Sequence, residues 1–323
     1  MLRSANGRGK TIVSDEKLHL PLEEVNRFAK RDPQKFIAYS ESRYRRQIDE
    51  VADQFASSFP QHRIILLSGP SSSGKTTTSH NLDTALEARG ISTFPLSLDD
   101  FFFDRDQAPL LPDGMPDLES PELVDTALLD QTLSDLFKNG SADFPIFDFK
   151  TGKRSAETRH VEYDDHTAII IEGLHALNPL ISEKPALKEA MRLYISIKTE
   201  YYEGEERILS TRQLRFIRRI IRDNNFRGCP PKGTIAMWKN VVRGEEEHIR
   251  PFRTLADVWI DSVHLYEPML YRPIAEKLLT PCLNDPDSEK EARVLLSALE
   301  KFTPLSGVRL PPDSLLREFL ENL

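Results

Sequence analysis

The sequence has few cysteines and no long apolar run, and both shortages exclude classes of protein. Two of its 323 residues are cysteine, Cys229 and Cys282, which is too few for a disulfide framework and offers no metal-ligand spacing. The longest aliphatic runs, residues 64–67 and 168–171, fall far short of the ~20 residues that a membrane-spanning helix needs. Residues 1–22 lack the apolar core of a signal peptide. We therefore expect a soluble, cytoplasmic protein that has no membrane partner.

Basic residues are also outnumbered. The chain carries 43 Lys and Arg against 51 Asp and Glu, for a net charge of -8. This surplus of acid disfavours nucleic acid as a partner, although a local basic stripe can still hold a phosphate. Hydrophobic residues at 39% and charged residues at 29% are proportions typical of a globular chain rather than a disordered one. Composition leaves open whether the protein forms a homo-oligomer.

Strand-like runs alternate with helical patterns along the chain. Runs of β-branched and other apolar residues predict strands at residues 63–68, 91–98, 167–171, 192–197 and 257–260. Apolar residues at helical spacing predict helices at residues 20–59, 76–89 and 118–138. This alternation is typical of βαβ units, so we expect an α/β fold with a mostly parallel sheet that is buried on both faces.

Three regions are expected. Residues 1–62 are predicted to form an N-terminal helical extension, residues 63–280 a core with a helical lid at about 207–245, and residues 281–323 a C-terminal helical tail packed on the core. In the tail, Ser288 and Glu291 have the spacing of a capping box ahead of an apolar helix face that includes Val294. Asp313 is expected to cap a last helix at residues 314–320.

Residues 69–76, Gly-Pro-Ser-Ser-Ser-Gly-Lys-Thr, match the phosphate-binding pattern G-x-x-x-x-G-K-[ST]. A strand run precedes the match and a helical pattern follows it, as the mechanism requires, because backbone N–H groups and a helix N-terminus together surround the phosphates. Lys75 is expected to reach the β- and γ-phosphates, and the Thr76 hydroxyl to bind Mg²⁺. The motif thus predicts ATP and Mg²⁺ as cofactors, held by Gly69, Ser71, Ser72, Ser73, Gly74, Lys75, Thr76 and Thr77.

Two carboxylates come directly after strand runs. In an open parallel sheet, ligands bind beyond the carboxyl ends of the strands, so we expect Asp99 beside the phosphate loop, placed to accept the proton of an attacking hydroxyl. Its neighbour Asp100 is expected to point elsewhere. Glu172 follows the run at residues 167–171 and is expected to hold the metal together with Thr76 and Asp99. No N-K-x-D segment is present, which disfavours a GTPase.

Four arginines, Arg215, Arg218, Arg219 and Arg222, fall within two turns of one predicted helix face. A solvated basic face is one interpretation. The phosphate loop upstream favours the other, a lid whose guanidinium groups close over the transferring phosphates and exclude water.

Taken together and in this order, the motifs resemble the phosphoribulokinase/uridine kinase family of P-loop kinases. The resemblance rests on residues 69–76, 97–102, 145–154, 172–173 and 215–223, and the tail at residues 311–319 is similar to its bacterial uridine-kinase-like branch. It implies a P-loop three-layer α/β/α fold. It also implies an ATP- and Mg²⁺-dependent kinase in which Asp99 is the catalytic base.

The resemblance further implies roles for individual residues. Lys75, Arg215 and Arg218 would act in catalysis, with Arg219 and Arg222 on the nucleotide. Asp117 would hold ribose hydroxyls, and Phe147 and Phe149 would line the nucleoside pocket. The full substrate-binding set is Asp99, Phe102, Asp117, Phe147, Phe149, Lys150, Arg154 and Arg215.

The sequence departs from the family pattern at the acceptor. Uridine-cytidine kinases carry Tyr where Phe147 stands and a base-reading His where Gly152 stands. A glycine offers no side-chain hydrogen bond, and losing a polar reader relaxes discrimination between acceptors. Lys150, Lys153 or Arg154 are the candidates to replace it. We therefore expect phosphoryl transfer to a small-molecule acceptor, a nucleoside 5′-hydroxyl first and a sugar or polyol second. A third reading is a non-catalytic ATP-binding regulatory or RNA-associated module.

Overall fold

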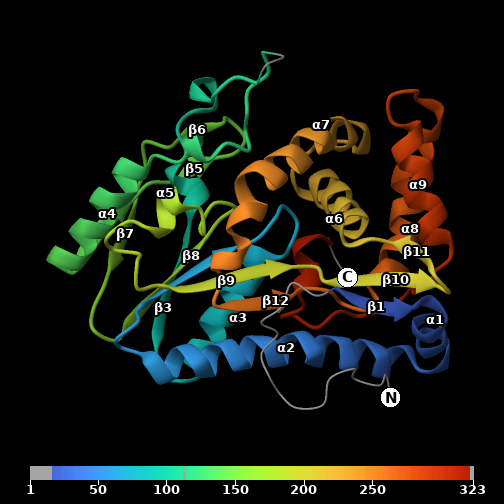
Figure 1. Ribbon diagram of the computed structural model, residues 1–323, viewed down its shortest axis with the longest axis horizontal. Coiled ribbons are helices and arrows are strands. Elements are labelled where there is room, and N and C mark those ends of the chain that lie inside the picture. The colour runs from blue at the N-terminus through green and yellow to red at the C-terminus, as the bar shows by residue number, and fades with distance from the viewer. Residues whose placement is uncertain (1–16, 112–113, 321–323) are drawn as a thin grey trace.

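The computed structural model describes residues 17–111 and 114–320. A single sheet of five parallel strands lies at its centre, in the order β12-β9-β2-β8-β3 (Figure 1). The strands are β2 (Ile64–Ser68), β3 (Ser92–Ser97), β8 (Thr167–Glu172), β9 (Met191–Ser196) and β12 (Val258–Asp261). All five predicted strands are therefore confirmed, as is the parallel sheet.

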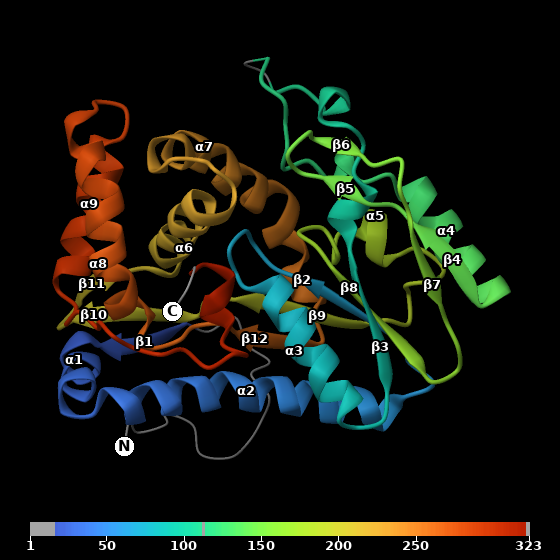
Figure 2. The same cartoon turned by 180° about the vertical axis from the view of Figure 1, so that it is seen from behind.

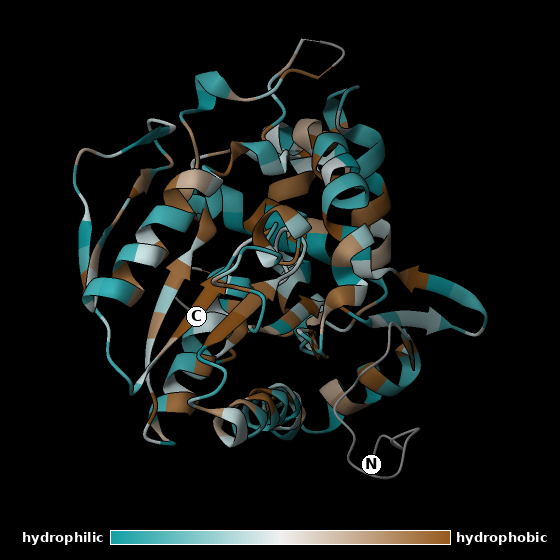
Figure 3. Cartoon of the chain, turned by 60° about the vertical axis from the view of Figure 1, so that its left-hand side comes forward, coloured by the Kyte–Doolittle hydropathy of each residue, from teal (hydrophilic) through white to brown (hydrophobic). Residues whose placement is uncertain are grey.

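The middle strand β2 shows why the fold has three layers. Its residues are all buried, and successive side chains point to opposite faces of the sheet. Ile65 and Leu67 pack in one hydrophobic cluster with the long helix α2 (Pro33–Ser58) and α3 (Lys75–Glu87). Ile64 and Leu66 pack in a second cluster with α4 (Thr126–Asn139). In Figure 3 the central strands are largely at the hydrophobic end of the scale, as expected for a sheet covered on both faces.

The N-terminal residues add a strand that the sequence did not reveal. β1 (Leu18–Pro21) pairs in parallel with β10 (Thr199–Glu203), which forms an antiparallel hairpin with β11 (Glu206–Leu209). This second sheet is short and polar on its outer side, so its pattern is weak. α1 (Leu22–Arg31) follows β1, and α2 then runs along the whole lower edge of the molecule beneath α3 (Figure 2).

The remaining elements complete the two faces. They are α5 (Pro179–Ser182), α6 (Thr211–Phe226), α7 (Pro231–Gly244), α8 (Glu267–Leu279), α9 (Glu289–Glu300), and the short strand pairs β4 (Ser141–Phe144) with β7 (Arg159–Glu162) and β5 (Phe147–Asp148) with β6 (Lys153–Arg154). Single turns of 3₁₀ helix lie at Leu98–Phe101, Arg105–Gln107, Pro121–Leu123, Arg250–Leu255, Thr280–Asn284 and Leu315–Glu318, and a π-helical turn lies at Glu245–Ile249. Among the residues described, none of the helices has the length and apolar character needed to cross a membrane.

Three local predictions were wrong. The helix expected over residues 118–138 begins only at Thr126, because Pro121 starts a separate 3₁₀ turn and Asp125 caps α4 by accepting the N–H of Leu128 (2.9 Å). Ser288 does precede α9, but its hydroxyl donates to Asp285 (2.7 Å) rather than forming a capping box. Val294, which was expected on the buried apolar face of this helix, is 49% exposed.

The helix expected over residues 314–320 is also different. Residues Leu315–Glu318 form one 3₁₀ turn capped by Ser314, whose Oγ accepts the N–H of Leu316. Asp313 does not cap it, because its carboxylate pairs with Arg45 of α2 (2.6 Å).

Candidate active site

The phosphate-binding pattern forms a tight loop between β2 and α3. Gly69 is required by close packing, since a Cβ there would lie 2.2 Å from the carbonyl oxygen of Ile195. Gly74 has φ +94°, and a Cβ there would lie 2.5 Å from Leu315 Cδ1. α3 begins at Lys75, so the first N–H groups of the helix are directed at the loop.

Lys75 lies inside this loop. Its Nζ donates to the carbonyl oxygens of Gly69 (3.0 Å) and Pro70 (3.4 Å). Burial lowers the pKa of Lys75, while the carboxylates of Glu172 and Asp99 oppose that change. A lysine held between a phosphate loop and two carboxylates is placed to contact a phosphate that enters the loop.

Both predicted acids lie at the ends of neighbouring strands. Glu172 is the last residue of β8. Its Oε1 accepts hydrogen bonds from Thr76 Oγ1 (3.4 Å) and Ser97 Oγ (3.2 Å). Asp99 follows β3, and burial raises its pKa even though Lys75 acts in the opposite direction. Burial likewise raises the pKa of Glu172, to about 7. Asp100 turns away, with Oδ1 accepting the N–H of Phe147 (3.2 Å).

These oxygens fit a bound Mg²⁺. The ion prefers one or two carboxylates, with phosphate oxygens and water completing its shell. Among the described residues no group of three His, Cys, Asp or Glu side chains could hold a metal alone, so a cation here would need a phosphate as well. Burial raises the pKa values of Asp99 and Glu172. A divalent cation bound between them would act in the opposite direction and favour the ionised form of both carboxylates.

The four arginines of α6 do not form a solvated face. All four are buried, and three of them contact the phosphate loop. Arg215 donates to the carbonyl of Ser71 (3.1 Å) and pairs with Glu245 (2.5 Å). Arg219 donates to Ser71 Oγ (2.7 Å). Arg222 pairs instead with its neighbour Asp223 (2.7 Å).

Arg218 is engaged entirely by protein groups. It donates to both carboxylate oxygens of Glu267, to Ser262, and to the carbonyl of Ser72 (3.3 Å). Its side chain is fully buried. The structure thus shows Arg218 bound both to Glu267 and to the backbone of the loop, and its role toward the phosphates stays a prediction.

The acceptor side contains residues that the sequence analysis missed. Asp117 accepts from Arg243 (2.8 Å) and from the N–H of Glu119 (3.1 Å). Burial raises the pKa of Glu119 to about 7, against the opposing charges of Arg219 and Lys75. A Cβ at Gly244 would lie 2.3 Å from Glu119 Cβ, so α7 packs closely against the base of the Glu119 side chain. The one feature of the sequence that could have pointed to Glu119 is its position two residues after Asp117, in the same acidic stretch.

His175 is the second missed residue. It follows Glu172 by three positions and is 3% exposed. Burial lowers its pKa to about 4, helped by His248 and Lys75, so the ring is neutral at pH 7. Its Nδ1 has no hydrogen-bond partner among the described residues, and its ring centroid lies 6.4 Å from that of His248. A buried, neutral imidazole beside Glu119 offers a further acceptor for a substrate hydroxyl.

The two phenylalanines expected to line the nucleoside pocket, Phe147 and Phe149, lie together in the structure, and their role there stays a prediction. Phe147 packs edge-on against Phe102 (5.7 Å) and Phe149 (5.3 Å). Phe149 is 47% exposed, and the guanidinium of Arg227 lies 6.0 Å from its ring. These rings provide an apolar surface beside the β5–β6 turn.

Two of the basic residues expected to replace a base-reading side chain, Arg154 and Lys150, have protein partners in the structure. Arg154 Nη2 donates to the carbonyls of Phe101 and Phe102 and to Asp125, so it holds the turn after Asp99. Lys150 is exposed, and its N–H binds Asp148 (2.8 Å). A Cβ at Gly152 would lie 2.5 Å from Arg105 Cδ, so Arg105 fills the space beside Gly152 and donates to the carbonyl of Phe149 (2.9 Å).

Comparison with known proteins identifies the family of this chain. Residues 64–267 match the model of the phosphoribulokinase/uridine kinase family, which confirms the resemblance seen in the motifs. The chain is 30% identical over 198 residues to a uridine kinase of Bacillus pumilus (61% of this chain, 85% of that protein). It is 29% identical over 198 residues to a uridine kinase of Bacillus subtilis (61% and 84%).

A solved structure has the same fold. A chain from Silicibacter sp. TM1040, described as a fructose transport system kinase, superposes with a TM-score of 0.51 at 21% identity, covering 66% of this chain and 98% of that chain. At this identity the likeness extends to the architecture alone. It agrees with the three-layer P-loop fold predicted from the sequence.

Proposed function

From the premise that this chain belongs to the phosphoribulokinase/uridine kinase family of ATP-dependent kinases, we propose that it transfers the γ-phosphoryl group of ATP to a hydroxyl of a small acceptor, in the first place the 5′-hydroxyl of a nucleoside. The observation that carries the proposal is the meeting of Lys75, Asp99 and Glu172 at the carboxyl edge of the sheet, where burial raises the pKa of both acids and Lys75 opposes the rise. A phosphate loop with an acid beside it is the arrangement that phosphoryl transfer requires.

Each residue then has a chemical task. Asp99 accepts the proton of the acceptor hydroxyl as that oxygen bonds to the γ-phosphorus and the bond to the departing ADP oxygen breaks. Lys75 neutralises charge on the phosphates that the loop binds. Mg²⁺, when bound, supplies further neutralisation, and Thr76, Asp99 and Glu172 would hold it.

The buried arginines act mainly by positioning the loop. Arg215 and Arg218 bind the carbonyls of Ser71 and Ser72, which orients the peptide N–H groups of the same segment. Arg219 donates to Ser71 Oγ in the loop, and the positive charge of Arg227 acts against the raised pKa of Asp99. We propose these two as the cations that face the transferring group.

The acceptor pocket is proposed to lie between α7 and the β5–β6 turn. Glu119, Asp117 and His175 would accept hydrogen bonds from sugar hydroxyls, and the ring of Phe149 would pack against a base. A second candidate acceptor is a sugar or polyol. Arg105 lies where a side chain at position 152 would stand, which removes a base-reading group from this turn.

An acceptor panel tests the proposal. Purified protein with MgATP is offered uridine, cytidine, adenosine, ribose, ribulose, glycerate and related polyols, and ADP release is measured. We expect little ADP release without acceptor and a strong rise with a nucleoside. A rise with polyols alone would support the second candidate. Uniform absence of acceptor-dependent turnover, with RNA binding that weakens steeply in salt, would instead favour the regulatory module.

A further inference from the structure

The C-terminal segment at residues 314–319 reaches the phosphate loop. Glu318 Oε2 accepts hydrogen bonds from the backbone N–H of Thr77 (3.2 Å) and from Thr77 Oγ1 (3.0 Å). Thr77 is the third residue of α3, so its N–H is one of the first-turn donors that the helix itself does not use. Figure 2 shows this segment, in red, between α6 and α3.

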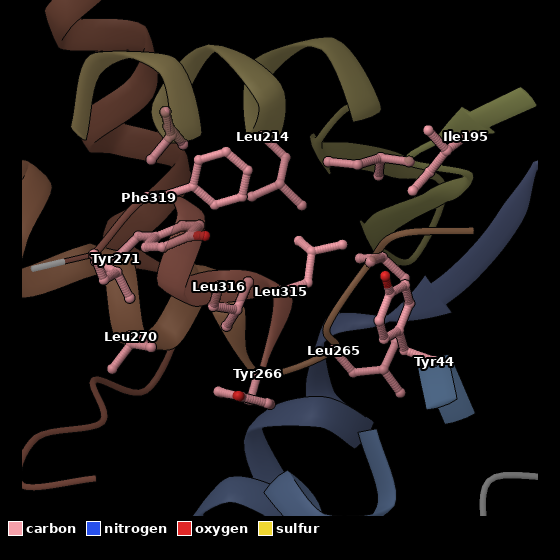
Figure 4. Close-up of a cluster of buried hydrophobic side chains, with 14 of the residues drawn as sticks. Tyr44, Ile195, Leu214, Leu265, Tyr266, Leu270, Tyr271, Leu315, Leu316 and Phe319 are labelled. Carbon is pink, nitrogen blue, oxygen red and sulfur yellow. The ribbon is translucent and has the colours of Figure 1, made fainter. Parts of the chain in front are cut away.

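The backbone of the segment is fixed to the core. Leu315, Leu316 and Phe319 are fully buried and lie among side chains of α6 and α8, as Figure 4 shows for Leu214 and Tyr271. This packing buries three large apolar side chains, which stabilises the docked position of the segment.

Polar contacts hold the same segment. Ser314 Oγ donates to the buried Glu41 of α2 (2.7 Å). The ring of Phe319 lies 5.0 Å from the guanidinium of Arg218, and its carbonyl accepts from Asn225 (3.2 Å). These contacts and the apolar packing together hold the backbone of the segment against the core.

Glu318 differs from its neighbours in this respect. Its side chain is partly exposed, and its carboxylate extends from the fixed backbone to Thr77. A carboxylate at the N-terminus of a helix occupies the same kind of position as a bound phosphate, because both are anions that accept backbone N–H groups.

The charge of Glu318 is also felt inside the site. Its negative charge raises the pKa of Lys75, as the charges of Glu172 and Asp99 do more strongly. It also raises the pKa of Glu172. A third carboxylate therefore faces the loop beside the two proposed for catalysis. An incoming nucleotide brings several negative charges to the same place.

We propose that Glu318 is a competing ligand of the nucleotide site: its carboxylate takes the Thr77 N–H that a phosphate of ATP would take, and nucleotide binding requires this side chain to rotate away while the segment around it stays docked. The inference rests on the proposed function, since it assumes that the loop binds ATP. Its consequence is that the chain itself lowers its affinity for nucleotides.

Equilibrium binding of a ligand series tests this competition. ATP, AMP and adenosine are titrated calorimetrically into the wild type, Glu318→Gln and Glu318→Ala. Removing one negative charge is expected to tighten binding of ATP and AMP about 5- to 30-fold at low salt, while adenosine, which has no phosphate, changes less than about twofold. The gain should shrink at high salt, because screening weakens the repulsion that was removed.

Asp313→Asn is the matched control. It removes one negative charge from the same segment, but Asp313 pairs with Arg45 at the surface and does not face the loop. Its affinity for ATP should equal that of the wild type. Thermal melting of each variant checks that the segment remains docked.

The outcomes separate the two hypotheses. Tighter ATP and AMP binding in both Glu318 variants, with adenosine and the control unchanged, supports the competition. If the wild type binds ATP and the Glu318 variants bind it equally well or more weakly, the competition is overturned and the kinase proposal is left intact. If neither wild type nor variants bind ATP, the proposed function fails and the inference fails with it.

Discussion

Arg218 of α6 and Glu267 of α8 form a two-fold hydrogen-bonded ion pair, with Nε–Oε2 at 2.6 Å and Nη2–Oε1 at 2.8 Å, and both side chains are fully buried. The same guanidinium contacts the carbonyl of Ser72 in the phosphate loop. The charges that balance Arg218 therefore come from the protein itself, and the pair links the loop to two helices.

Breaking this pair should destabilise the fold. Arg218→Met leaves the buried carboxylate of Glu267 without its cationic partner, and we expect a loss of about 3–5 kcal/mol in the free energy of unfolding, measured by urea denaturation. The double variant Arg218→Met/Glu267→Leu should lose less than Arg218→Met alone, because no unpaired charge remains. A loss under about 1 kcal/mol in the single variant would mean that water reaches the pair.

Asp99→Asn should separate catalysis from nucleotide binding. The amide keeps the shape of the side chain but cannot accept the hydroxyl proton, so kcat is expected to fall about 10²- to 10⁴-fold. Affinity for ATP, measured by direct titration, should change little because the loop contacts remain. Unchanged turnover would remove Asp99 from the mechanism.

Glu119→Gln should act on the acceptor alone. The backbone N–H of Glu119 donates to Asp117 and its Cβ packs against α7. Losing a charged hydrogen bond from its carboxylate to a substrate hydroxyl costs roughly 1.5–3 kcal/mol. We therefore expect kcat/KM for the acceptor to fall about 10- to 100-fold with the KM for ATP unchanged. Glu122→Gln, an exposed acid three residues later, is the control and should match the wild type.

His175 should give the protein a specific acid sensitivity. Its pKa is lowered to about 4 from 6.5, mainly by burial, so between these values the unfolded chain binds a proton that the folded chain does not. Stability supplied by the neutral ring is thus present above pH 6.5 and is lost as the pH falls toward 4, at up to about 1.4 kcal/mol per pH unit.

The comparison with His175→Gln isolates this effect. Glu119 and Glu172, whose raised pKa values act in the opposite sense, are present in both proteins and drop out of the difference. The unfolding free energy of the wild type minus that of the variant should decrease between pH 6.5 and 4.5 in urea melts. A difference that stays constant with pH would show that His175 is solvated.

The sequence predicted those parts of the fold that local patterns determine. The phosphate loop and the five strands were readable because spacing alone defines them, and Asp99 and Glu172 followed from the rule for the ends of parallel strands. Glu119 and His175 were missed because their significance comes from burial beside Lys75, which no local pattern encodes. The burial of the α6 arginines is not encoded locally either, since two of their partners, Glu267 and Glu245, lie 30 or more residues away.

The position of Leu315 against Gly74 has a consequence for how the protein is made. Residues 314–319 are translated after every strand and helix that they touch, so the ribosome releases this wall of the phosphate loop long after the loop itself. A nascent chain that ends before Pro304 would leave the back of Arg218 without the ring of Phe319. The phosphate loop is therefore complete only after residues 314–319 have been made, and not when its own motif emerges.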